Sequence, residues 1–159
     1  MADHFAQPAA SAVAAARHGF EVRLTWTDGL VVLSVCDAVD ALTAPQLSKV
    51  ICDALGQSPF GMIVDLTDVE FLACIGMSVL VAAREAADAF SVQFGVVADG
   101  VATSRPIRLL GLDATLKLYP TLDHAIRDFK EAPAVGGIAE TPSSSPSYLP
   151  RGVVRPSRG

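Results

Sequence analysis

The sequence predicts an α/β domain with a mixed β-sheet of about four to five strands. Residues 21–27 alternate apolar and polar side chains, as a half-buried strand does, and the dipeptide Asp28-Gly29 after them is typical of a two-residue hairpin turn. Residues 60–64 and 92–97 are short and almost wholly apolar, which indicates strands buried on both faces. Helical patterns precede both runs. Because a strand, a helix and a second strand form a parallel crossover, the sheet is expected to combine both strand directions.

The first predicted helix follows a strand over residues 30–35 and a loop over residues 37–43. Thr43 is suited to the N-cap, and Pro45 falls in the first turn, where its missing N–H costs nothing. Apolar residues then recur every three or four positions until Gly56, which ends the helix.

A second helix is predicted over residues 75–90. Small residues on one face, among them Gly76, would let this helix lie close to the sheet. The opposite face combines charged residues with Met77 and Val81. These two are either scattered surface residues, which need no explanation, or part of a docking patch beside Cys74.

Smaller elements follow toward the end of the chain. A short helix near residues 106–110 is closed by Gly111, a short edge strand covers residues 116–119, and a last helix covers residues 121–129.

The expected domain organisation is a single folded domain between two tails. The folded domain spans residues 20–131, where the periodic patterns lie. Residues 1–19 read as a flexible Ala-rich arm, and residues 132–159 as a disordered tail rich in Pro, Ser and Arg.

Composition narrows the classes of function. A formal net charge of −5 argues against a nucleic-acid binder, which needs clustered cations, so a protein or small ligand is the expected partner. Three cysteines without a C-x-x-C motif suggest a reducing, cytosolic setting. The start of the chain has no signal-like pattern, and the longest apolar run, residues 71–83, is too short to span a bilayer. We expect a cytoplasmic protein that binds neither nucleic acid nor membrane.

The most informative stretch is residues 64–80. It reads as the end of a buried strand, a short polar loop and the first turn of a helix, with Cys74 and Gly76 at the junction. A helix start presents unpaired N–H groups and the positive end of the helix dipole. The junction therefore suits a charge switch or a docking point.

Patterns for catalysis are weak. No Gly-rich phosphate loop follows a predicted strand, and the cysteines and histidines lack metal-ligand spacing, so we expect neither a cofactor nor a metal. Carboxylates near the strand ends, between Asp37 and Glu70, are interpreted as turn formers and caps. Cys74 is a buried packing residue, a redox-active thiol, or a nucleophile whose only candidate base is His124. We expect a binding protein and not an enzyme.

Three segments resemble the sulphate-transporter and anti-sigma-antagonist (STAS) domain, and most of all the free-standing bacterial anti-sigma factor antagonists. Residues 40–45 resemble the family's loop after the second strand, with its Asp and its Thr-Ala-Pro helix start. Residues 64–72 resemble its strand-and-loop signature, and residues 109–113 with 118–121 resemble its closing segment. The resemblance covers about residues 21–130. It implies a STAS-like fold whose helices pack mainly on one face of the sheet.

The resemblance also implies an anti-sigma factor antagonist, which docks onto an ATP-binding, kinase-type anti-sigma factor and so frees a sigma factor for transcription. In switchable members the second helix begins Asp-Ser-Ser/Thr-Gly, and phosphorylation of the first Ser breaks the complex. Here those positions read Ala73-Cys74-Ile75-Gly76, which offers a Ser/Thr kinase no hydroxyl at the switch position. The residues expected to bind the partner are Asp40, Thr43, Phe71, Leu72, Ala73, Cys74, Gly76, Met77 and Val81.

A second interpretation stays open. In this interpretation the protein is a STAS-type scaffold or a ligand-binding module of a transporter or signalling assembly. Oxidation of Cys74 would then regulate it.

Overall fold

The computed structural model of the protein describes residues 10–17 and 19–131. The chain divides into two compact units, residues 1–126 and 127–159. The helix α4 crosses the boundary between these units. The described elements, in chain order, are β1 (Ala10–Arg17), β2 (Phe20–Thr27), β3 (Leu30–Val39), α1 (Ala44–Leu55), β4 (Gly61–Leu72), α2 (Cys74–Ala89), β5 (Gln93–Val97), α3 (Ser104–Leu109), the 3-10 helix η1 (Leu112–Ala114), β6 (Leu118–Tyr119) and α4 (Leu122–Glu131).

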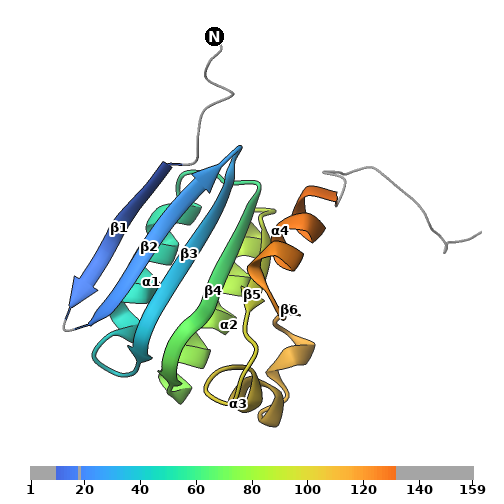
Figure 1. The fold of residues 1–159 in the computed structure, drawn as a ribbon. Coiled ribbons are helices and arrows are strands. Elements are labelled where there is room, and N and C mark those ends of the chain that lie inside the picture. The colour runs from blue at the N-terminus through green and yellow to red at the C-terminus, as the bar shows by residue number, and fades with distance from the viewer. Residues whose placement is uncertain (1–9, 18, 132–159) are drawn as a thin grey trace, which may run out of the picture. The chain divides into compact units, whose positions relative to one another are not determined.

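The strands form one sheet of six, in the order in which they occur in the chain (Figure 1). The strands β1, β2 and β3 pair antiparallel, whereas β3, β4, β5 and β6 pair parallel. Helices α1 and α2 lie behind the sheet in Figure 1, and each connects two parallel neighbours. The predicted mixed α/β fold is therefore confirmed, with six strands instead of four to five.

The additional strand is β1, which lies in the segment predicted to be a flexible arm. Residues 10–17 pair antiparallel with β2, with one irregularity between Val13 and Ala15. The prediction of a flexible arm was wrong for these residues. An alanine-rich strand shows no alternation of apolar and polar side chains, and this one is defined by its backbone hydrogen bonds to β2. The rest of the predicted arm, and the predicted tail over residues 132–159, lie outside the described residues.

The hairpin between β2 and β3 has the predicted turn. Asp28 and Gly29 have φ values of 53° and 86°. Positive φ at both central residues is typical of a type I′ turn. The twist of this turn matches the twist of the two strands that it joins. Thr27 and Leu30 accordingly close the ladder on either side.

The strands β3 and β4 are longer than the sequence predicted. The polar loop expected after Asp65 is a continuation of β4, which ends only at Leu72 and pairs with β3 as far as Val39. The register shifts twice, and Asp37 has a φ of 75° at one of these irregularities. Bulges of this kind bend a strand and re-aim its side chains without ending the ladder. They place polar residues such as Glu70 in solvent, which made a strand look like a loop.

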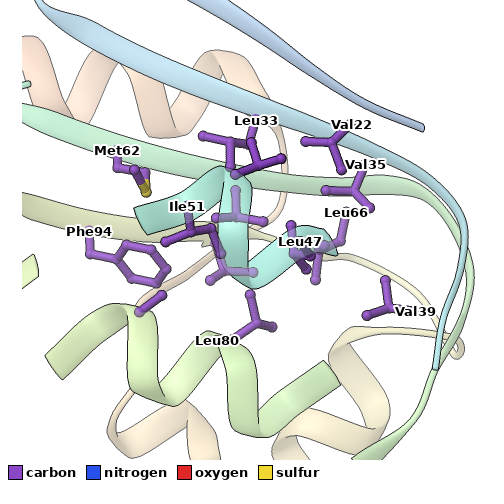
Figure 2. Close-up of a cluster of buried hydrophobic side chains, with 14 of the residues drawn as sticks. Val22, Leu33, Val35, Val39, Leu47, Ile51, Met62, Leu66, Leu80 and Phe94 are labelled. Atoms are coloured by element: carbon purple, nitrogen blue, oxygen red, sulfur yellow. The ribbon is translucent and has the colours of Figure 1, made fainter. Parts of the chain in front are cut away.

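The hydrophobic core lies between the sheet and the two helices α1 and α2. Figure 2 shows Leu47 and Ile51 of α1 and Leu80 of α2 directed toward sheet residues that include Leu33. All four side chains are at least 98% buried. Each contributes about 1.5–3 kcal/mol relative to an exposed side chain. This packing holds both helices against the sheet. It thereby positions the start of each helix at the edge where β3 and β4 end.

Gly76 determines how closely α2 approaches the sheet. A Cβ atom at this position would lie 2.7 Å from Val39 Cγ1 and 2.8 Å from Leu72 Cδ1. Both distances are shorter than van der Waals contact, and the Val39 side chain is stiff because it branches at Cβ. The predicted role of Gly76 in close packing agrees with this geometry.

We expect Gly76→Ala to lower the free energy of unfolding by about 1–2 kcal/mol, because overpacking outweighs the gain in helix propensity. Urea titration followed by circular dichroism measures this. Gly100→Ala is the matched control, because a Cβ atom there meets nothing within 4 Å. An unchanged midpoint for Gly76→Ala would contradict the packing role.

Candidate functional site

The candidate site lies at the edge of the sheet where the parallel strands end. The loop from β3 to α1 and the junction from β4 to α2 both leave the sheet at the carboxyl ends of their strands. The predicted site residues fall on these two connections and on α2.

Hydrogen bonds within the loop before α1 hold its shape. The Thr43 hydroxyl donates to the Ala38 carbonyl oxygen at 2.8 Å and accepts from the Asp40 N–H at 3.0 Å. The Asp40 carboxylate accepts from the N–H groups of Leu42 at 2.9 Å and Thr43 at 3.2 Å. Thr43 stands at the N-cap position, but its side chain makes no capping bond to α1. The predicted N-cap position of Thr43 is confirmed, but its hydroxyl is used within the loop and not to cap the helix.

The loop and the junction lie side by side. The Ala73 N–H donates to the Val39 carbonyl oxygen at 2.9 Å, and the Val39 side chain fills the space beside Gly76. Ala73 is the N-cap residue of α2 and supplies no side-chain cap. The first N–H groups of α2 therefore receive no side-chain acceptor from this residue.

Exposed apolar side chains surround the start of α2. Leu42 is 73% exposed, Phe71 55% and Ile75 47%, and Leu110, from the segment after α3, is also exposed. We call these four residues the apolar rim. Of the four, only Phe71 was among the predicted partner-binding residues. The other three lie far apart in the sequence, and only the fold shows that they belong to one edge.

Four of the predicted partner-binding residues are buried, namely Thr43, Leu72, Gly76 and Met77, and two of them are large apolar side chains. Leu72 is 4% exposed and Met77 is 3% exposed, and both belong to the hydrophobic core. They are not part of an exposed contact surface, so this part of the prediction was wrong. Leu72 ends β4 against Val39 and Gly76. Met77 lies on a side of α2 that residues distant in the sequence cover. The spacing of apolar residues within one helix cannot predict such contacts.

A groove runs along α2 beside the apolar rim. It has a volume of about 360 Å³. Its walls are formed by side chains of α2 and by two leucines from the segment after α3, and its lining residues are Cys74, Met77, Ser78, Val81, Ala82, Glu85, Leu110 and Leu112. We call it the α2 groove. The predicted residue Val81 is half-buried and lies in this groove.

The three cysteines are free thiols in different environments. Cys74 is the first residue of α2 and is exposed, so its interpretation as a buried packing residue was wrong. Cys36 is half-buried, and burial, followed by the carboxylates of Asp68 and Glu21, raises the pKa of its thiol. A raised pKa leaves little thiolate at neutral pH, which makes Cys36 poorly nucleophilic.

A catalytic pair at Cys74 finds no support in the geometry. Within the described part of the chain, the side chain of Cys74 makes no hydrogen bond. The candidate base His124 lies with its ring edge-on to Tyr119, at 5.6 Å between ring centroids. Its backbone N–H donates to the Thr121 hydroxyl at 3.1 Å. A nucleophilic cysteine needs a base within hydrogen-bond reach, and this arrangement does not provide one.

The carboxylates at the strand ends act locally. Asp40 accepts hydrogen bonds from its own loop, which agrees with its interpretation as a turn former. Asp65 accepts hydrogen bonds from the N–H and hydroxyl of Thr67, but both residues lie within β4, so Asp65 is not a turn former. Asp37, Asp68 and Glu70 line a separate hollow beside Cys36. No group of three or more His, Cys, Asp or Glu residues in the described ranges could hold a metal ion.

The fold and its signature segments identify the family. The model of the STAS domain matches residues 21–125. The chain therefore belongs to the STAS domain family.

Individual relatives carry more specific names. The chain is 41% identical over 99 residues to the anti-sigma-F factor antagonist RsfB of Mycobacterium tuberculosis, which covers 62% of this chain and 80% of RsfB. The crystal structure of an anti-sigma factor antagonist from Mycobacterium paratuberculosis superposes with a TM-score of 0.66 at 39% identity, covering 74% of this chain and 99% of that one. A sulfate transporter family protein from Wolinella succinogenes superposes with a TM-score of 0.58 at 16% identity, covering 65% and 86%. This last likeness shows the fold alone.

Among the described residues, no helix is both long enough and apolar enough to span a bilayer.

We expect Thr43→Val to lower the free energy of unfolding by about 1–3 kcal/mol, because it leaves the Asp40 N–H and the Ala38 carbonyl without their partner. Thr43→Ser keeps the hydroxyl and is expected to lose less than half as much. Urea titration of both variants measures the difference. Equal losses would show that the loop does not depend on the hydroxyl.

Proposed function

We propose that this protein is an anti-sigma factor antagonist, which binds an anti-sigma factor through the apolar rim and so regulates sigma-factor-dependent transcription. The observation that carries the proposal is the apolar rim, set around the start of α2 in a chain that is 41% identical to the antagonist RsfB. Exposed apolar residues gathered at one edge are typical of protein interfaces. The relatives' names supply the kind of partner.

The shape of the rim suits a pre-formed interface. The Asp40 and Thr43 hydrogen bonds fix the backbone that carries Leu42, and β4 carries Phe71. Side chains held on fixed backbone lose little conformational freedom on binding, which favours affinity. Truncating one of the few central anchors of an interface costs about 2 kcal/mol or more.

The partner is proposed to be of the kinase type, and binding to be free of phosphorylation control. A phosphate at the start of α2 would add about −1.5 to −2 charge among the apolar side chains and oppose docking. Cys74 occupies that position, and its thiol is no substrate for a Ser/Thr kinase. The nearby hydroxyl of Thr43 is buried and engaged in hydrogen bonds. The rim therefore stays available whether or not ATP is present.

We expect Phe71→Asp to weaken binding to the purified anti-sigma factor at least 30-fold, because it places a charge where an apolar anchor is desolvated. Isothermal titration calorimetry measures this. Phe90→Asp is the matched control, since Phe90 is also an exposed aromatic residue and lies at the opposite end of α2. Equal effects of the two substitutions would move the interface away from the rim.

Incubation of the wild-type protein with the kinase-type anti-sigma factor and ATP is expected to leave its mass unchanged in intact-protein mass spectrometry. The absence of a hydroxyl at position 74 is the reason. A relative with Ser at this position serves as the positive control. Stoichiometric phosphate on Thr43, Thr67 or Ser78 would contradict control-free binding while leaving the docking proposal intact.

A further inference from the structure

Two arginines of α3 differ from the other cations of their unit. In residues 19–126, the remaining described cationic side chains each have a partner on the protein: Arg23 with Glu21 at 2.8 Å, Lys49 with Asp53 at 2.9 Å, Arg84 with Asp88, and Lys117 over the ring of Tyr119. Arg105 and Arg108 are exposed, and neither forms an ion pair with another described residue.

These arginines line a hollow that is otherwise largely apolar. It has a volume of about 490 Å³ and lies between the loop after β5 and α3. Val101 and Leu109, which are 78% and 73% exposed, form its apolar wall, and Asp99 is the one carboxylate in its lining. We call it the arginine hollow. Two unpaired guanidinium groups beside exposed apolar side chains are well suited to carboxylates that are attached to an apolar segment.

The arginine hollow continues the apolar rim. Leu109 belongs to the hollow, and the next residue, Leu110, belongs to both the rim and the α2 groove. The loop after β5 also leaves the sheet at the carboxyl end of a parallel strand, as the two connections that carry the rim do. A partner that covers Leu110 therefore needs to extend only a short distance to contact Leu109 and the two arginines.

We propose that the arginine hollow is a second part of the docking surface and receives an acidic, partly apolar segment of the anti-sigma factor. This inference rests on the proposed function. The occupant follows from charge complementarity: the chain has a formal net charge of −5, so an acidic segment is repelled by most of its surface and attracted here. The two arginines then orient the partner, and the rim supplies the apolar contact.

The test measures the affinity and its salt dependence with the purified anti-sigma factor. The variant is Arg105→Gln with Arg108→Gln, and the matched control is Arg23→Gln with Lys49→Gln, which removes the same charge from paired cations elsewhere. At low salt we expect the α3 variant to bind at least tenfold more weakly and to lose most of the salt dependence. The control is expected to stay within twofold of the wild type.

The outcomes separate this inference from the proposed function. If the wild type binds, Phe71→Asp abolishes binding and the α3 variant binds like the wild type with the same salt dependence, the arginine hollow is excluded and the antagonist function stands. If the wild type binds no anti-sigma factor of its organism, the proposed function fails, and the inference fails with it.

A cross-linking experiment identifies the occupant directly. A photo-reactive phenylalanine at position 109 is expected to link to an anti-sigma factor segment that contains Asp or Glu among apolar residues. A link to a basic segment, or no link in a complex that forms, would overturn the assignment. A third outcome would also overturn the assignment: the wild type binds phosphatidylglycerol vesicles, and the α3 variant loses this binding but still binds the anti-sigma factor like the wild type. The hollow would then be a site for a membrane surface.

Discussion

The contact between Val39 and the start of α2 holds the functional edge of this protein together. The Val39 carbonyl accepts the Ala73 N–H, and its side chain occupies the space that Gly76 leaves open. One residue thus joins the end of β3 to the start of α2. A methyl group added at Gly76 would push α2 away from Val39. This movement would separate the loop that carries Leu42 from the strand end that carries Phe71.

This arrangement divides buried from exposed apolar residues along a short stretch of chain. Leu72, Gly76 and Met77 face inward and set the position of α2, whereas Phe71 and Ile75 face outward. The inward set stabilises the fold, and the outward set is available to a partner. Cys74 lies between them on the exposed side.

Much of the fold could be predicted because its signals are local. The Asp28-Gly29 turn, the apolar stripe of α1 around Leu47 and the closing role of Gly111, whose φ is 73°, follow from short-range patterns. The strand β1 and the far half of β4 could not be predicted in this way. Their backbone pairing is long-range, and their side chains are alanines in one case and exposed polar residues in the other.

The candidate site was predicted less completely for a related reason. Its position at the junction before α2 was clear from residues 64–80, but the exposure of single residues depends on neighbours far along the chain. Met77 is covered on a flank of α2 that the helical pattern assigned to solvent, and Leu110 becomes part of the α2 groove only through the fold. Which apolar residues remain outside is a property of the packed molecule.

The most direct measurement of the central claim is amide hydrogen exchange of this protein with and without its purified anti-sigma factor. Docking at the edge of the sheet predicts slower exchange in residues 40–43, 71–78 and 104–112 in the complex, and unchanged exchange in the hairpin around Asp28. Protection confined to the hairpin or to the acidic hollow near Asp68, with residues 71–78 unaffected, would contradict it.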